Sequence, residues 1–186
     1  MLNLAEKYKK EVIAKMQEKF GYKNAMAVPK IVKVSVNSGF GRQIAGKTSD
    51  EQKKTYEFVA EDLKVICGQK PVLRKAKKSI SSFKIREGMV IGSSVTLRGG
   101  RMNDFLDRLI HVALPRSRDF RGIDPKSFDI KGNLTIGLKE HIAFPEVSPE
   151  KAKNIFGLEI TIATNAKKKE EGIELLKFLG FPIKKI

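Results

Sequence analysis

The stretch Ile31-Val-Lys-Val-Ser-Val-Asn37 alternates apolar and polar residues with a period of two. This period is typical of a strand that buries one of its faces. The three valines are predicted to face the core: Val32, Val34 and Val36. The polar side chains of the same strand are predicted to face away from it: Lys33, Ser35 and Asn37. The stretch therefore predicts a sheet with one buried and one open face.

Helical and strand-like patterns surround this strand. Apolar residues three to four apart, with capping residues at the ends, predict four helices, at 4–20, 49–67, 99–114 and from about 165 to 179. Alternating residues predict four further strands, at 80–86, 89–98, 128–138 and 158–163. Glu87-Gly88 would join the first two of these strands as a hairpin, and Gly132-Asn133 would interrupt the third as a turn or bulge.

The order of these elements, α-β-α-β-β-α-β-β-α, predicts an α+β fold. We expect a single domain over residues 1–186, with an antiparallel-rich sheet, helices packed on one face and the other face open for RNA, as in ferredoxin-like and RRM folds. The open face would carry short polar and basic side chains, among them Lys33, Ser35, Asn37, Ser94 and Thr96. Such a face suits RNA, whose shallow minor groove displays 2′-hydroxyls.

The chain is strongly basic. Its 186 residues contain 37 Lys and Arg against 21 Asp and Glu, a net charge of +16. Residues 22–121 contribute +12 of this charge, and the other 86 residues contribute only +4. A localised excess of positive charge favours a surface that binds a polyanion. Nucleic acid is therefore the first expected partner.

The densest positive segment, residues 69–86, contains seven basic residues and no acid. We interpret it as a basic arm at about residues 70–86 that follows RNA phosphates, with an ordinary solvated loop as the alternative. The arm intersperses basic and hydroxyl side chains: Arg74, Lys75, Lys77, Lys78, Ser79, Ser81 and Lys84. Its few apolar anchors, Leu73, Ile80 and Phe83, predict that the arm is mobile in the free protein.

Two smaller arginine clusters each allow two interpretations. Arg98-Gly-Gly-Arg101 joins a strand to a helix, so it is either a structural turn or a phosphate contact made with the free amides of the helix start. The second cluster surrounds Asp119 and consists of Arg116, Arg118 and Arg121. An ion pair with Asp119 would stiffen this loop, and a contact with RNA or protein is the alternative.

No pattern in the sequence is typical of an enzyme or a metal site. The two histidines, His111 and His141, share no local spacing with Cys67 or with carboxylates, and no P-loop or nucleophile-elbow motif occurs. Cys67 ends an apolar helix face, where a small buried thiol is the ordinary interpretation. We expect no catalysis, cofactor, metal or disulfide. With no long apolar run and no export signal, we also expect a cytoplasmic protein without a membrane partner.

Several short motifs occur together and in order over nearly the whole chain. They include Gly39-Phe-Gly41, Gly68-Gln-Lys-Pro-Val72, Ala76-Lys-Lys-Ser-Ile80, Phe83-Lys-Ile-Arg-Glu-Gly88, Val95-Thr-Leu-Arg-Gly99, Leu114-Pro-Arg116, Arg118-Asp-Phe-Arg-Gly122, Phe144-Pro-Glu146 and Gly180-Phe-Pro182. With these motifs the chain resembles the universal family of large-subunit ribosomal protein five, whose bacterial members bind 5S rRNA. Each motif alone is weak, but together they are highly specific.

The resemblance implies a ribosomal protein of the central protuberance. Its partners would be 5S rRNA, large-subunit rRNA, P-site tRNA and, across an intersubunit bridge, small-subunit ribosomal protein thirteen. The 5S rRNA contacts implied are Lys33, Ser35, Asn37, Lys70, Ser94, Thr96 and Arg98, and the tRNA contacts are those of the basic arm. Other RNA or protein contacts are Arg101, Arg116, Arg118 and Arg121. A free-standing RNA chaperone that uses the same basic surface is the alternative.

Overall fold

The strand predicted from residues 31–37 lies in the middle of a five-stranded sheet. The computed structural model describes residues 3–118, 120–147 and 154–184. Its strands are β1 (Ile31–Gly39), β2 (Val72–Lys75), β3 (Val90–Leu97), β4 (Leu134–Leu138) and β5 (Leu158–Thr164). They lie in the order β2-β3-β1-β5-β4, and each neighbouring pair is antiparallel. The predicted α+β fold with an antiparallel sheet is therefore confirmed.

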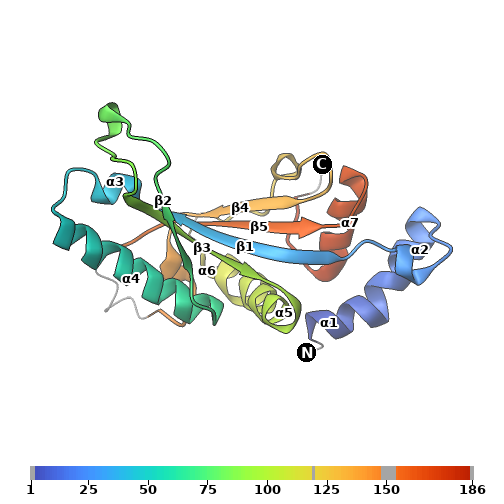
Figure 1. Cartoon of the computed structure of the whole chain (residues 1–186). Coiled ribbons are helices and arrows are strands. Elements are labelled where there is room, and N and C mark those ends of the chain that lie inside the picture. The colour runs from blue at the N-terminus through green and yellow to red at the C-terminus, as the bar shows by residue number, and fades with distance from the viewer. Residues whose placement is uncertain (1–2, 119, 148–153, 185–186) are drawn as a thin grey trace.

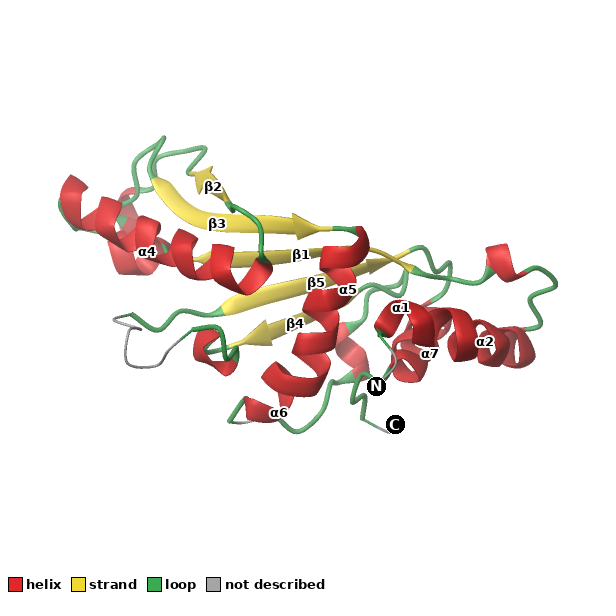
Figure 2. Ribbon diagram, turned by 90° about the horizontal axis from the view of Figure 1, so that it is seen from below, coloured by secondary structure: helices red, strands yellow, loops and turns green. Residues whose placement is uncertain are grey.

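The helices gather on one side of this sheet and beyond one of its ends (Figure 1 and Figure 2). The N-terminal helix comprises α1 (Leu4–Lys7), a π-helical turn (Tyr8–Val12) and α2 (Ile13–Phe20). The others are α3 (Gly41–Ile44), α4 (Ser49–Cys67), α5 (Gly99–Arg108), α6 (Leu114–Arg116) and α7 (Lys169–Leu179). A second π-helical turn, Leu109–Ala113, links α5 to α6. Figure 2 looks from the helix side and shows α5 crossing the strands and α4 lying along β3.

The core lies between this helical layer and one face of the sheet. Val34 and Val36 of β1 are fully buried there, as are Val59 and Leu63 of α4. Phe105 of α5 stacks on Phe144, with ring centroids 5.6 Å apart. The start of α4 is fixed by Thr48 and Glu51, which form a capping box. Gly68 ends the helix in the left-handed conformation that favours glycine.

Val32 does not face the core, so this part of the predicted alternation is wrong. Its side chain is 40% exposed. The pairing of β1 with β5 shifts between Ile31 and Lys33, which places one extra residue in β1. A bulge of this kind turns the intervening side chain out of the alternation.

The hairpin predicted for residues 80–86 and 89–98 is also wrong. The partner of β3 is β2, at residues 72–75, inside the segment predicted as a mobile arm. Residues 81–83 form a short 3₁₀ turn, and only one bridge, between Ile80 and Ile85, remains of the predicted strand. Charge density does not oppose strand pairing at a sheet edge, where lysine and arginine side chains stay in solvent.

Two boundaries differ near the C-terminus. The predicted long strand 128–138 is a bridge at Phe128, a turn at residues 129–132 and the strand β4, so Gly132-Asn133 belongs to a turn rather than a bulge. Ile130, expected within the alternation, is 88% exposed in that turn. The last helix begins at Lys169, four residues later than predicted, because Asn165 accepts a hydrogen bond from the amide of Lys30 instead of capping the helix.

Candidate nucleic-acid interface

Four hydroxyl side chains cross the open face of the sheet in one row. Thr96 of β3 is opposite Ser35 of β1, and Ser35 is opposite Thr161 of β5. Thr161 is in turn opposite Thr135 of β4, and their hydroxyl oxygens are 3.4 Å apart. Because side chains alternate between the faces of a strand, all four point away from the helices. We call these residues the hydroxyl row.

Asn37 and Ser94 lie one step along the strands from the hydroxyl row, on the same face. The amide nitrogen of Asn37 donates a hydrogen bond to Oε2 of Glu159 on β5, with a donor–acceptor distance of 3.2 Å. The predicted outward orientation of Asn37 is therefore confirmed, but its amide already has a partner. Lys33, opposite Ala163, lies on the other side of the row and brings a positive charge to this face.

The edge strand β2 extends the same face. Arg74 lies on this strand and donates a hydrogen bond from Nε to the Ser94 hydroxyl at 2.8 Å. Gln69, just before the strand, donates to the backbone oxygen of Thr96 at 3.4 Å, and the neighbouring Lys70 is exposed. Two residues predicted for different partners, Arg74 for tRNA and Ser94 for 5S rRNA, are thus joined in one surface.

The rest of the basic arm forms a loop that rises from one end of the sheet (Figure 1). At its base, the amide of Ala76 donates to the oxygen of Met89 at 2.8 Å. In its middle, Ile80 and Ile85 exchange backbone hydrogen bonds of 2.9 and 3.2 Å. The polar arm residues are all exposed: Lys75, Lys77, Lys78, Ser79, Ser81 and Lys84. The backbone thus holds the loop while the charged side chains extend into solvent.

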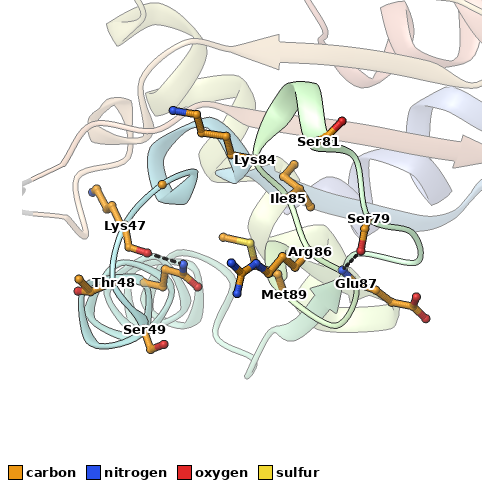
Figure 3. Close-up of a pocket in the computed structure, with 12 residues that line it drawn as sticks. Lys47, Thr48, Ser49, Ser79, Ser81, Lys84, Ile85, Arg86, Glu87 and Met89 are labelled. Carbon is orange, nitrogen blue, oxygen red and sulfur yellow. Dashed lines mark hydrogen bonds between the residues drawn. The ribbon is translucent and has the colours of Figure 1, made fainter.

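A hollow of about 780 Å³ separates this loop from the start of α4 (Figure 3). Its lining includes three cationic side chains, Lys47, Lys84 and Arg86, and no ion pair involving them occurs among the described residues. Hydroxyl groups add to the polar lining: Thr48, Ser49, Ser79 and Ser81. Figure 3 shows the Arg86 side chain pointing toward α4, whereas the carboxylate of Glu87 points away.

The two arginine clusters lie at different places. Arg98 precedes α5, whose first residue, Gly99, has a φ of +61°, which suits a structural turn. Arg98 and Arg101 are exposed there, which suits a phosphate contact, so both interpretations stay predictions. Arg116 and Arg118 line a second hollow, of about 470 Å³, beside β4. Arg121 is exposed on the loop that follows. The predicted ion pair with Asp119 lies outside the described residues.

Cys67 and His141 are both buried in the interior of the protein. Cys67 is buried, as predicted, and burial raises the pKa of its thiol to about 12. His141 is also buried, stacked on Phe156 with ring centroids 3.8 Å apart. Its Nε2 lies 3.2 Å from Oδ2 of Asp62, and burial lowers the pKa of the imidazole. Within residues 3–118, 120–147 and 154–184, no group of three potential metal ligands occurs.

Sequence reasoning missed part of the open face. Thr135, Glu159 and Thr161 lie on strands whose alternation was recognised, so the same period-two argument would have placed them there. Lys47 and Arg86 belong to the hollow, but no sequence signal pairs them, since they come from segments some 40 residues apart that only the fold brings together.

In the part of the chain that the structure describes, no helix is long and apolar enough to cross a membrane.

Comparison with known proteins identifies the family. The family model for the C-terminus of ribosomal protein L5 matches residues 90–183, and the model for ribosomal protein L5 itself matches residues 24–86. The large ribosomal subunit protein uL5 of Halothermothrix orenii is 52% identical over 179 residues, which cover 96% of this chain and 97% of that protein. The uL5 protein of Dictyoglomus turgidum is 53% identical over 182 residues, or 98% of each chain. That of Marinomonas sp. is 51% identical over the full length of both.

Matches of this extent include both the sheet and the basic arm, and they leave no part of the fold unaccounted for. The resemblance recognised in the sequence is therefore confirmed. The chain belongs to the uL5 family of ribosomal proteins, non-enzymatic structural constituents of the large ribosomal subunit.

Proposed function

We propose that the open sheet face binds 5S rRNA and helps to hold it in the central protuberance of the large subunit. The observation that carries this proposal is the hydroxyl row, which extends over four adjacent strands without an apolar or acidic side chain in it. Hydroxyl groups both donate and accept hydrogen bonds. They match the 2′-hydroxyls and base edges of a shallow RNA minor groove.

Basic groups at the margins of this face would supply the attraction to phosphates. Lys33 lies beside the hydroxyl row, and Lys70 and Arg98 lie near the ends of β2 and β3. Phosphate contacts position a protein on RNA, whereas the uncharged groups between them discriminate its shape. The predicted likeness to an RRM, in which a sheet face receives RNA, belongs to this proposal.

The loop of the basic arm would contact P-site tRNA. It projects away from the sheet and carries three lysines, at residues 77, 78 and 84, so it can reach a partner that the sheet itself does not touch. The predicted mobility of the arm would suit a partner that arrives and leaves. Arg116, Arg118 and Arg121 would serve a separate contact with RNA or protein. Another surface would meet small-subunit ribosomal protein thirteen across the intersubunit bridge.

Binding of the purified protein to 5S rRNA at different salt concentrations tests the main proposal. With 6–10 phosphates contacted, affinity should fall by about 10³–10⁵ between 50 and 200 mM salt. Asn37→Ala should weaken binding by about 1–3 kcal/mol with little change in melting temperature. Affinity that does not depend on salt, or equal losses of stability and binding in the variant, would contradict the proposal.

Sedimentation distinguishes this function from that of a free-standing RNA chaperone. A structural constituent should sediment almost wholly with large subunits in a cell lysate. A large free pool under growth conditions would favour the chaperone. Pull-down of the tagged protein followed by sequencing of bound RNA should recover 5S rRNA together with the other large-subunit rRNA, whereas a chaperone should recover a broad mixture of cellular RNAs.

A further inference from the structure

Phe83 is exposed at the far end of the basic arm. Its side chain is 63% exposed, whereas every other phenylalanine and tyrosine in the described ranges is buried or half-buried. The sequence predicted Phe83 as one of the few apolar anchors of the arm. The structure contradicts this role, because an anchoring ring would be buried against the body of the protein.

The ring is not needed to hold the local backbone. Phe83 is the last residue of the 3₁₀ turn Ser81–Phe83, the helical turn at the top of the loop in Figure 1. The Lys84 amide closes this turn by donating to the Ser81 oxygen at 3.0 Å, and the Ile80–Ile85 pair closes the loop below it. Lys84 itself has a φ of +52° and ends the turn. Backbone hydrogen bonds therefore fix the position from which the ring projects.

The surroundings of the ring are positive. Lys77, Lys78 and Lys84 are exposed on the same loop, and no acid occurs between residues 69 and 86. An apolar protein partner would gain nothing from these charges, whereas a polyanion would be attracted by them. Every RNA base has a flat π-face, and aromatic side chains interleaved with basic ones are typical of surfaces that bind unpaired nucleotides.

We propose that Phe83 stacks on an unpaired base of RNA while the neighbouring lysines bind its phosphates. This inference rests on the RNA-binding function proposed above and adds the residue that recognises a base. Such stacking does not depend on sequence, because any base presents a π-face. It does require an unstacked base, so loops and folded corners of RNA are suitable ligands and a continuous duplex is not.

A tryptophan at this position would report stacking directly. The chain contains no tryptophan, so Phe83→Trp introduces a single fluorophore. Ile130→Trp is the matched control, since Ile130 is 88% exposed beside Lys131 in a turn outside the arm. Each variant is titrated with tRNA, with 5S rRNA and with a fully paired RNA duplex of similar charge, and complex formation is measured in parallel by filter binding.

We expect the tryptophan emission of Phe83→Trp to be quenched in complexes with tRNA or 5S rRNA and unchanged with the duplex, while the emission of Ile130→Trp changes with none of them. Quenching by tRNA alone assigns the base to tRNA, and quenching by 5S rRNA alone assigns it to rRNA. Either supports stacking. Unchanged emission of Phe83→Trp in every tRNA and 5S rRNA complex that filter binding detects would overturn the inference but leave the proposed RNA-binding function intact. Failure of the wild-type protein to bind either RNA would overturn both.

Conservative variants give a second measurement. Phe83→Leu keeps an apolar side chain but loses the π-face, and it should weaken binding of the RNA that quenches the Phe83→Trp variant by roughly 5- to 100-fold. Phe83→Tyr keeps the ring and should bind within about twofold of wild type. Equal affinities of the Leu and Tyr variants, with unchanged circular dichroism, would assign Phe83 a merely apolar role and overturn the inference.

Discussion

Gly172 of α7 lies directly against Gly132 in the turn before β4. A Cβ atom placed on Gly132 would be 2.9 Å from the Cα of Gly172, and one placed on Gly172 would collide with the backbone of Gly132. Gly132 also has a φ of +75°, a conformation that favours glycine. The two residues therefore allow the last helix to approach the sheet more closely than any side chain would permit.

Gly172→Ala should destabilise the protein by about 2–4 kcal/mol, because backbone atoms cannot rotate away from the new methyl group. Gly137→Ala is the control, since a Cβ at Gly137 on β4 would meet no atom within 4 Å. Chemical denaturation of both variants checks the prediction. If Gly172→Ala is as stable as Gly137→Ala, α7 can move away from Gly132 without loss of unfolding free energy.

Thr161→Val should weaken 5S rRNA binding by about 1–2 kcal/mol, because it removes one hydroxyl from the row without changing side-chain volume much. The neighbouring Ile160→Val is the matched control. That side chain is fully buried, so the variant should lose about 0.5–1.5 kcal/mol of stability and keep its RNA affinity. Filter binding and thermal denaturation separate the two effects, and a Thr161→Val protein that binds like wild type would remove the hydroxyl row from the interface.

Glu159→Gln should strengthen RNA binding roughly 2- to 5-fold at low salt. Glu159 places a negative charge on the open face, where it would repel phosphates. A glutamine oxygen can still accept the hydrogen bond from the Asn37 amide, so the local geometry should be kept. The gain should vanish at high salt, where the repulsion is screened. An equal gain at every salt concentration would point to a change in shape instead of charge.

His141 should make stability depend on pH. Burial lowers its pKa below the ordinary 6.5, and Asp62 opposes this effect only in part. Its Nδ1 accepts a hydrogen bond from the Phe156 amide at 3.4 Å, which also requires that this nitrogen be unprotonated. As the pH falls below 6.5, the unfolded chain takes up a proton that the folded protein does not. The free energy of unfolding should therefore fall by at most about 1.4 kcal/mol per pH unit.

His141→Gln should remove this contribution to the pH dependence between pH 7.5 and 5.5, even though the variant is less stable throughout. His111→Gln, at the other histidine, is the control, because the His111 side chain is exposed. Denaturant titrations at several pH values give the slope of the unfolding free energy against pH for each variant. If the His141 and His111 variants have the same slope as wild type, the imidazole of His141 is not the group responsible.

Charge reversal in the arm (Lys75, Lys77 and Lys78 to Glu) should preserve the fold, since all three side chains are exposed. It should leave 5S rRNA binding largely intact and reduce tRNA occupancy on assembled ribosomes, most visibly at higher salt. Footprinting on purified ribosomes measures this. The hydrogen bond between Arg74 and Ser94 makes Arg74 part of the sheet surface, so it is left unchanged. Exclusion of the triple variant from the large subunit would assign the arm to rRNA binding.

The arrangement of the open face could be predicted from the sequence because it depends on local geometry. The alternation of residues 33–37 orients each side chain relative to its neighbours, and this orientation is the same whatever strand lies beside it. The capped helix at 49–67 and the buried face of the helix beginning at Gly99 were predictable for the same reason, since caps and apolar periodicity act within a few turns.

Pairing between distant segments was decided only by the tertiary structure. Strand β2 was not recognised because four residues, two apolar followed by two basic, carry almost no local signal, and only the edge of β3 gives them a partner. The outward Val32 depends on a bulge against β5, and the hollow between Lys47 and Arg86 depends on two loops meeting. The ring of Phe83 is exposed because β3 pairs with β2, which leaves the segment that contains Phe83 outside the sheet. Sequence patterns report which faces are apolar, whereas hydrogen bonding between strands far apart in the chain determines which of these faces are covered.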